Sequence, residues 1–373
     1  MRGIIEVNLK NLTDNFCFFR KKLPQSVSVA AVVKANAYGH GLKEVVRALN
    51  EKADYFIVAT FEEALLAREH TEKRILCLSP LRGEEIVVSV FKNIDIIISS
   101  ERDLDEIICK TENMRIPTCV HMCVDTGMNR MGIKNEKVAY KLINRIKSHK
   151  NIKLEGVFSH FFDAENKQRR EMQTERFNGF LRFIDCALED GESRSDKQTD
   201  KTADGCGGAY LAHIAATEAA FCCNSLYSMV RIGIGLYGYG VSGVKPCMSV
   251  KSLVSRVEKV KKGEYVGYNG AFIATKDCFV ATVSAGYGDG IFRSFSGGEV
   301  LINGRRRKII GNVCMDYCFA LTDKETKAGD EVVFIGEQGG DVLTADDMAK
   351  ACGTISYEIL TSFKRFPVKY IRP

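Results

Sequence analysis

The chain has 373 residues, of which 45% are hydrophobic and 27% are charged, the balance of a globular protein with a large core. No apolar run approaches the roughly 18 residues needed to cross a bilayer, and residues 1–12 lack the apolar segment of a signal peptide. The net charge is only +6 and the basic residues are interspersed with acidic ones, which argues against a nucleic-acid surface. We therefore expect no contact of this chain with nucleic acid or with a membrane.

The 14 cysteines do not form a disulfide framework of the kind found in short secreted proteins. Several of them lie in apolar segments, where a free cysteine behaves as a small hydrophobic residue, and no C-x-x-C pair occurs. Cys119, His121 and Cys123 alternate in a way that resembles a metal-ligand cluster, but alternation along a strand explains it better. The prediction is a reduced, cytoplasmic protein without a metal site.

From about residue 26 to residue 239 the chain alternates short apolar runs with amphipathic segments. The apolar runs precede Lys34 and then cover residues 54–60, 74–79, 94–99, 118–124, 154–161, 209–215 and 229–238. Continuous β-branched runs are typical of parallel strands buried on both faces. The segments between them, such as 42–52, 61–70 and 137–148, have the apolar spacing of helices. Eight such units predict an α/β fold, a TIM (β/α)8 barrel over residues 8–240, in preference to an open doubly wound sheet.

Two features depart from this rhythm. Residues 190–208 are polar, charged and rich in glycine, which predicts an exposed loop. After about Val241 the helical period disappears, and short strands alternate with Gly, Asn-Gly and Asp-Gly turns. We expect a mostly-β C-terminal domain over residues 241–373 with one late helix at 345–352, joined by the opening strand at 1–7.

Candidate functional residues follow the predicted strands of the barrel, where the sites of this fold lie. Lys34 ends the most apolar run, and burial there lowers the pKa of a lysine and frees its amine as a nucleophile. Arg130, His160, His213 and Arg231 also follow or end strands. Each alone could merely cap a strand or satisfy loop carbonyls, but together they indicate a site on one barrel face. The glycine-rich residues 231–240 permit either an approach to an anion or close strand packing.

Eight motifs, in this order, carry a resemblance over nearly the whole chain. They are AVVKANAYGHG (31–41), DTGMNRMG (125–132), SHF (159–161), VRIGIGLYG (230–238), VGYNGAF (266–272), GYGDG (286–290), GNVCMDY (311–317) and ISYE (355–358). Together they resemble the alanine racemase family, which binds pyridoxal 5'-phosphate (PLP) in a barrel followed by a β-domain. The resemblance implies an isomerase that interconverts L- and D-alanine, supplying D-alanine for peptidoglycan.

The resemblance also implies roles for particular residues. Lys34 would bind PLP covalently and act as one base, and Tyr268 would be the second base, contributed by the other subunit of a homodimer. Arg130 and Met315 would bind the substrate, an amino acid, and Tyr287 and Asp316 would line the entrance and the interface. The residues implied to contact the cofactor are Lys34, Tyr38, Arg130, His160, Thr217, Arg231, Gly233, Ile234 and Tyr357.

The resemblance implies that the guanidinium of Arg231 faces the pyridine nitrogen of PLP, where other PLP enzymes use a carboxylate. This arrangement implies a weak electron sink that favours racemisation over transamination. His160 is further implied to tune Tyr268.

The sequence departs from the family pattern at three places. Cys123 occupies a position where some members carry a carbamylated lysine that braces the arginine corresponding to Arg130. Ala216-Thr217 replaces an Asn-Ser pair before the phosphate-binding helix, and the 190–208 segment is longer than expected.

Three alternatives remain at this stage. A serine racemase of the vancomycin-resistance type shares the catalytic domain behind a membrane domain, but tends to carry Asn where this chain has Tyr357. A related PLP decarboxylase would need a carboxylate at the pyridine nitrogen in place of Arg231. A non-catalytic PLP-binding barrel would not need Tyr268.

Overall fold

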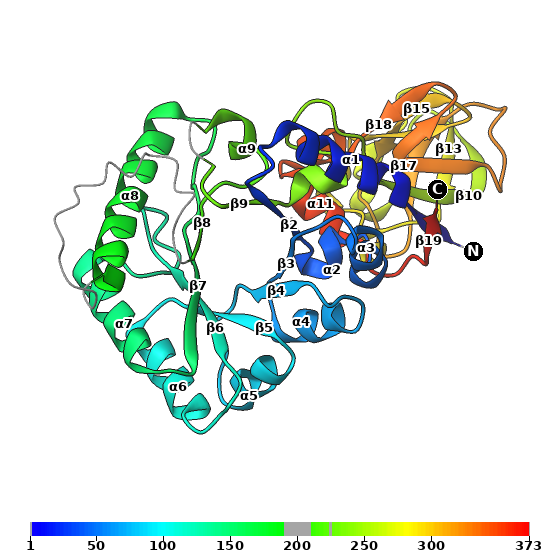
Figure 1. Ribbon diagram of the computed structural model, residues 1–373. Coiled ribbons are helices and arrows are strands. Elements are labelled where there is room, and N and C mark those ends of the chain that lie inside the picture. Colours follow the sequence, from blue (N-terminus) through cyan, green and yellow to red (C-terminus); the bar gives the residue numbers. More distant parts are fainter. Residues whose placement is uncertain (1, 190–209, 224–225, 373) are drawn as a thin grey trace.

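The computed structural model of the protein describes residues 2–189, 210–223 and 226–372. The loop predicted at 190–208 lies outside these residues. The described chain forms two large sheets (Figure 1): a ring of parallel strands with helices outside it, and a β-rich unit that holds both chain ends.

The first sheet is the predicted TIM barrel. Its eight parallel strands follow one another in the order β8-β7-β6-β5-β4-β3-β2-β9. The strands are β2 (Ser28–Val32), β3 (Tyr55–Val58), β4 (Arg74–Cys77), β5 (Ile94–Ile98), β6 (Thr118–Cys123), β7 (Ile152–Phe158), β8 (Leu211–His213) and β9 (Met229–Ile232). The ring closes between β8 and β9, where Ala216 bridges Arg231 in parallel and the Arg231 amide donates to the Ala215 carbonyl.

Several of the helices form where the sequence has helical spacing and a capping residue. Thr60 and Ser100, for example, accept from the amides of Glu63 and Asp103 and so begin two of them. The helices outside the strands are α1 (Leu9–Lys22), α3 (Leu42–Leu49), α4 (Phe61–Arg68), α5 (Glu84–Phe91), α6 (Glu101–Thr111), α7 (Glu136–Ser148), α8 (Lys167–Glu189) and α9 (Ala219–Cys222). The last predicted run, 229–238, is a strand only to Ile232 and continues as a 3-10 turn, η1 (Ile234–Tyr237).

The second sheet has nine strands in the order β18-β17-β14-β15-β16-β13-β10-β1-β19. Its strands are β1 (Gly3–Asn8), β10 (Met248–Val260), β13 (Cys278–Val283), β14 (Glu299–Ile302), β15 (Arg305–Ile310), β16 (Cys318–Thr322), β17 (Glu331–Gln338), β18 (Asp341–Leu343) and β19 (Val368–Ile371). The opening strand β1 lies here, antiparallel to β10 and parallel to β19. The sheet therefore joins the beginning of the chain to its end.

Several short elements lie between the strands of this second sheet. They are β11 (Tyr265–Val266), β12 (Phe272–Ile273), the 3-10 turns η2 (Tyr268–Gly270), η3 (Tyr287–Asp289) and η4 (Arg293–Phe295), and the helices α10 (Ala345–Cys352) and α11 (Ser356–Ser362). The sequence predicted α10 but not α11. One continuous buried cluster extends from the barrel into the second sheet, so the two share a core. No helix among the described residues has the length and apolar character needed to span a membrane.

Candidate active site

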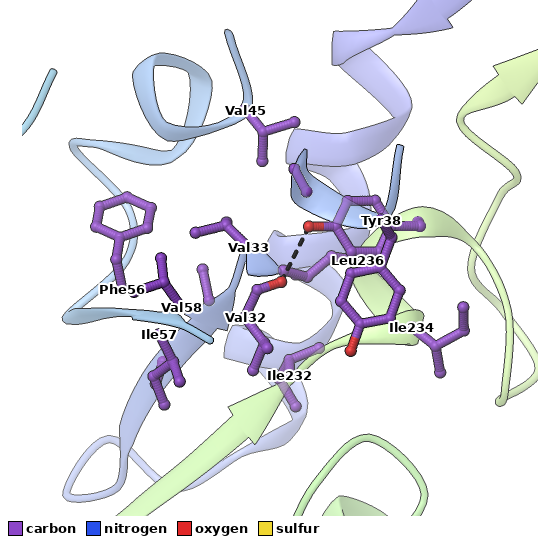
Figure 2. Close-up of a cluster of buried hydrophobic side chains, with 14 of the residues drawn as sticks. Val32, Val33, Tyr38, Val45, Phe56, Ile57, Val58, Ile232, Ile234 and Leu236 are labelled. Atoms are coloured by element: carbon purple, nitrogen blue, oxygen red, sulfur yellow. Dashed lines mark hydrogen bonds between the residues drawn. The ribbon is translucent and has the colours of Figure 1, made fainter. Parts of the chain in front are cut away.

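Lys34 stands where β2 leaves the barrel interior. The strand before it packs into a cluster of buried hydrophobic side chains that includes Val32, Val33 and Ile57 (Figure 2). The next residues form the short element α2 (Lys34–Tyr38), which contains a left-handed turn, a conformation that is unfavourable for L-amino acids. Ala35, Asn36, Ala37 and Tyr38 all have φ between 53° and 55°. Because a left-handed turn costs roughly 1–2 kcal/mol per residue, this strain has to be offset by surrounding contacts.

Two side chains hold the left-handed turn in place. Glu63, on α4, accepts from the backbone amide of Asn36 at 3.1 Å and from that of Ala59 at 3.0 Å. The Asn36 side chain in turn accepts from the amide of Leu42 at 2.9 Å, where α3 begins. These contacts fix the direction in which the chain leaves β2, and with it the position of Lys34.

A cavity of about 640 Å³ opens at the C-terminal ends of the barrel strands. It is lined by nine residues that the sequence singled out: Lys34, Tyr38, Arg130, His160, Thr217, Arg231, Gly233, Ile234 and Tyr357. These residues lie up to 323 positions apart in the sequence, from Lys34 to Tyr357. Their common cavity supports the expectation of one site for Lys34, Arg130, His160 and Arg231, whereas His213, also expected there, is not among the lining residues.

Arg231, on β9, is buried in the cavity wall, with 5% of its surface exposed. Its Nη1 donates to His213 Nδ1 at 2.7 Å and to the His213 carbonyl at 3.0 Å. Its Nη2 donates to the Ser159 carbonyl at 2.8 Å and lies 3.1 Å from His160 Nδ1. Burial lowers the pKa of Arg231 to about 10, so the group stays cationic at neutral pH. The guanidinium is thus a fixed positive charge whose terminal nitrogens already have protein acceptors.

The pKa of Lys34 lies below its ordinary value of 10.5. Burial is the largest cause, followed by the positive charges of Arg130 and Arg231, while Glu63 acts in the opposite direction. Both main causes disfavour the ammonium form. The neutral amine, which is the form that acts as a nucleophile or a base, is therefore more accessible here than in water.

The glycine-rich turn after β9 meets two hydroxyl groups. Thr217 Oγ1 accepts from the amide of Gly233 at 3.1 Å and from that of Gly235 at 3.3 Å. A Cβ at Gly233 would lie 2.7 Å from the Tyr38 hydroxyl oxygen, so only glycine allows the phenol to approach. A Cβ at Gly235 would also lie 2.4 Å from the ring of Phe19, so the glycine-rich run allows close packing, while its approach to an anion stays a prediction.

Arg130 and Cys123 lie at the same cavity. Cys123 is buried and burial raises the pKa of its thiol to about 12, so it is neutral at pH 7. Its Sγ lies 3.8 Å from the Met131 carbonyl. A neutral thiol cannot neutralise the Arg130 charge as a carbamate would, which agrees with the departure noted in the sequence.

Four residues implied by the resemblance lie apart from the cavity lining. Tyr268 is 69% exposed on η2, and Met315 is 55% exposed after β15. Tyr287 is also exposed on η3, and Asp316 pairs with Arg365 at 3.0 Å. Within this single chain the structure therefore brings Lys34 together with the implied cofactor contacts but not with the implied second base.

Buried histidines predict how stability depends on pH. Burial lowers the pKa of His40 to about 4 and, with the charge of Arg231, that of His160 to about 3, against an ordinary 6.5. His213 shifts in the same direction. Below pH 6.5 the unfolded chain therefore binds protons that the folded chain does not, and each group removes up to about 1.4 kcal/mol of stability per pH unit.

We expect the urea concentration at the midpoint of unfolding to decrease as the pH is lowered from 7 to 5. Most carboxylates stay ionised over this range. His40→Asn should flatten part of that fall. A midpoint that does not change over this range would contradict neutral buried histidines.

Some residues of the site could not be found from the sequence. Glu63 and Asn36 carry no motif signal, because their role depends on the left-handed turn. His121 was interpreted as one position of an alternating strand, and it does lie on β6. The sequence signal that could have indicated polar neighbours for His121 is the presence of a histidine in an otherwise apolar barrel strand.

The fold and the cavity define a protein of the TIM-barrel class whose pocket at the strand ends is lined by Lys34, Arg130 and Arg231. The chain matches the family models "Alanine racemase, N-terminal domain" over residues 7–241 and "Alanine racemase, C-terminal domain" over residues 247–370. The chain belongs to the alanine racemase family.

Relatives and solved structures agree with this assignment. The chain is 35% identical over 366 residues to the alanine racemase of Thermodesulfovibrio yellowstonii, with 96% of this chain and 94% of the relative covered. It is 32% identical over 381 residues to that of Listeria monocytogenes, with 98% and 97% covered. The crystal structure of alanine racemase from Bacillus anthracis with bound L-Ala-P superimposes with a TM-score of 0.88 at 30% identity, covering 100% of this chain and 95% of that one.

A histidine racemase from Leuconostoc mesenteroides also shares the fold, with a TM-score of 0.83 over 99% of this chain and 98% of that one, at 22% identity. At this identity the similarity concerns the fold alone.

Proposed function

We propose that this chain is a PLP-dependent alanine racemase. The observation that carries the proposal is the cavity in which Lys34, with a lowered pKa, lies near the buried guanidinium of Arg231. The names of the relatives support alanine as the substrate.

The residues around the cavity fit PLP. Lys34 supplies an amine for the aldehyde. Tyr38 and Thr217 supply hydroxyl donors suited to a phosphate, and Thr217 Oγ1 accepts from the Gly233 amide, so its own proton is left to donate. The hydrogen bonds of Arg231 among the described residues use Nη1 and Nη2, which leaves Nε–H for the ring nitrogen.

Racemisation requires a proton to leave Cα on one face and a proton to arrive on the other. When bound, PLP draws electrons from Cα and so makes its hydrogen acidic. Lys34, as a neutral amine, takes and returns the proton on one face. Free lysine and tyrosine have pKa values near ~10, and the lowered pKa of Lys34 brings it closer to the working pH.

We propose that the second base is Tyr268 of another copy of this chain. Tyr268 is exposed and lies outside the cavity lining, so its own chain does not use it at this cavity. Tyr287, Met315 and Tyr317 are also exposed on the same β-rich unit, and we propose that they contribute to the contact between the two copies of a homodimer. In this arrangement the domain proposed at 241–373 of one chain contributes Tyr268 to the site in the domain proposed at 8–240 of the other chain.

Arg231 affects the balance between racemisation and transamination. A guanidinium only donates hydrogen bonds, so it leaves no proton on a ring nitrogen that faces it. We expect Arg231→Glu to raise transamination relative to racemisation, because a carboxylic acid can protonate that nitrogen. The measurement is the ratio of pyruvate to inverted alanine, which does not depend on the folded fraction. Arg231→Lys is the control, since it keeps a cationic donor, and an unchanged ratio in both variants would contradict the role of Arg231.

Tyr357 lies at the cavity with its ring centroid 5.9 Å from that of Tyr38. It narrows the pocket and favours the small methyl side chain of alanine. A serine hydroxyl adds little bulk, however, and a pocket of this kind rejects such isosteres weakly. The proposed product, D-alanine, would serve peptidoglycan synthesis. The proposed compartment is the cytoplasm, which suits the thirteen free cysteines of the described chain.

Proton NMR in D₂O tests the function directly. We expect purified protein with PLP to exchange the α-proton of L-alanine well ahead of that of L-serine. Serine exchanging first would indicate the serine racemase. Exchange of neither would indicate a PLP-binding barrel without racemase activity.

A further inference from the structure

A row of buried polar side chains runs through the barrel behind Arg231. It comprises His213 at the end of β8, His121 on β6 and Asp95 on β5, each at most 1% exposed. His213 Nε2 lies 3.1 Å from His121 Nδ1, and His121 Nε2 lies 3.5 Å from Asp95 Oδ2. The proposed reaction uses only Arg231 of this row.

The direction of the hydrogen bonds in this row is fixed from the Arg231 end. A guanidinium has no acceptor, so the 2.7 Å contact requires a lone pair on His213 Nδ1. A neutral His213 then carries its proton on Nε2. That N–H points at His121 Nδ1, which must accept, so a neutral His121 also carries its proton on Nε2.

The other end of the row accepts this last proton. His121 Nε2 faces Asp95 Oδ2 and, at 3.4 Å, the hydroxyl of Tyr55. Tyr55 donates to Asp95, and Arg74 Nη2 donates to Asp95 Oδ1 at 2.6 Å. The hydrogen bonds therefore continue from Arg231 to the Asp95 carboxylate through the Tyr55 hydroxyl, which accepts from His121 Nε2 and donates to Asp95.

Arg74 and Tyr55 begin their strands, and Asp95 is the second residue of β5. Because all the strands are parallel, these three residues lie at the end of the barrel opposite the cavity. The Arg74 side chain is 29% exposed and also contacts Glu155 at 3.4 Å. The row therefore links a charged pair at the bottom of the barrel to the cavity wall.

The barrel interior is shaped to hold the two imidazole rings. A Cβ at Gly156, on β7, would lie 2.2 Å from His121 Nδ1, so the ring occupies space that only glycine leaves open. The Phe158 ring stacks on His213 with centroids 5.2 Å apart and planes 8° from parallel. Arg231 lies 5.8 Å from the centroid of the same ring. These neighbours keep both histidines from turning away from the row.

We propose that Asp95, Tyr55, His121 and His213 form a one-directional hydrogen-bond chain, with both histidines protonated on Nε2, that positions Arg231 from the far end of the barrel. They are positioning residues, since Arg231 alone of the row lines the cavity. Reversing either imidazole would set two donors or two lone pairs against each other in a buried site. The consequence for PLP rests on the proposed function, whereas the tautomers are properties of the chain itself.

The test is long-range proton–nitrogen NMR of the full chain labelled with nitrogen-15 at its six histidines, with and without PLP. His121→Asn and His213→Asn assign the two signal sets. At neutral pH we expect each of these histidines to show one protonated Nε2 and one unprotonated Nδ1. A protonated Nδ1 or a cationic ring at either position would overturn the proposal, whether or not the protein is a racemase.

Asp95→Ala should shift the His121 Nε2 signal, while both histidines keep the tautomers that are fixed from the Arg231 end. Asp103→Ala is the matched control, because Asp103 is also buried and paired with an arginine, Arg82 at 2.6 Å. It should leave both histidines unchanged. An unshifted His121 Nε2 signal in Asp95→Ala would remove Asp95 from the chain. Should Asp95→Ala fail to fold, Tyr55→Phe replaces it; it should shift His121 Nε2 while keeping its tautomer, and no shift there would overturn the Asp95–Tyr55 end.

Discussion

Replacement of Lys34 by alanine is expected to remove covalent cofactor binding and nearly all racemisation. The variant loses the amine that bonds to the aldehyde, and general-base catalysis alone contributes about 10²–10⁴-fold to the rate. The chain should then show no PLP-derived absorbance after dialysis and no mass increase after borohydride reduction. Folding should persist, because Lys34 makes no hydrogen bond or ion pair among those found in the described chain.

Lys43→Ala is the matched control for this experiment. Lys43 lies nine positions further along and is exposed on α3. It should keep both the absorbance and the activity. A borohydride-stable adduct in Lys34→Ala at the level of the unmodified protein would show that another amine holds the cofactor.

Replacement of Tyr268 by phenylalanine is expected to affect the two enantiomers of alanine unequally. Only one face of Cα loses its base, so the α-proton of L-alanine should exchange about 10²–10⁴-fold more slowly. D-Alanine should still exchange its α-proton with solvent through Lys34, with retention of configuration. Exchange has to be followed for each enantiomer separately, since the net racemisation rates in the two directions are bound together by equilibrium.

Tyr265→Phe provides the control on the same surface. Tyr265 is 68% exposed, close to the 69% of Tyr268, and lies three positions before it. Its loss should change neither exchange rate. Equal slowing of both enantiomers in Tyr268→Phe would contradict the assignment of one base to each face.

Much of the fold could be predicted from the sequence because it depends on the burial of apolar runs. Each of the eight predicted barrel runs contains a strand, since continuous β-branched residues are stable only where both strand faces are covered. The opening strand likewise pairs in the second sheet. The domain boundary near residue 240 stays a prediction.

Other features depend on contacts that no local pattern encodes. Ala35 and Ala37 have no preference for positive φ. Their conformation depends on the hydrogen bond that the Asn36 amide donates to Glu63. The tautomers of His121 depend on the register that places it beside His213. The role of Tyr268 requires a second chain, and no single-chain pattern shows it.

The central claim is that one site is built from Lys34 of one chain and Tyr268 of another. Mixing the inactive variants Lys34→Ala and Tyr268→Phe, after dissociation and reassociation, tests it most directly. A mixed dimer holds one site with both bases intact and one with neither, so about one quarter of the unmodified activity should return at equal amounts. A mixture as inactive as its two components would contradict a site shared between chains.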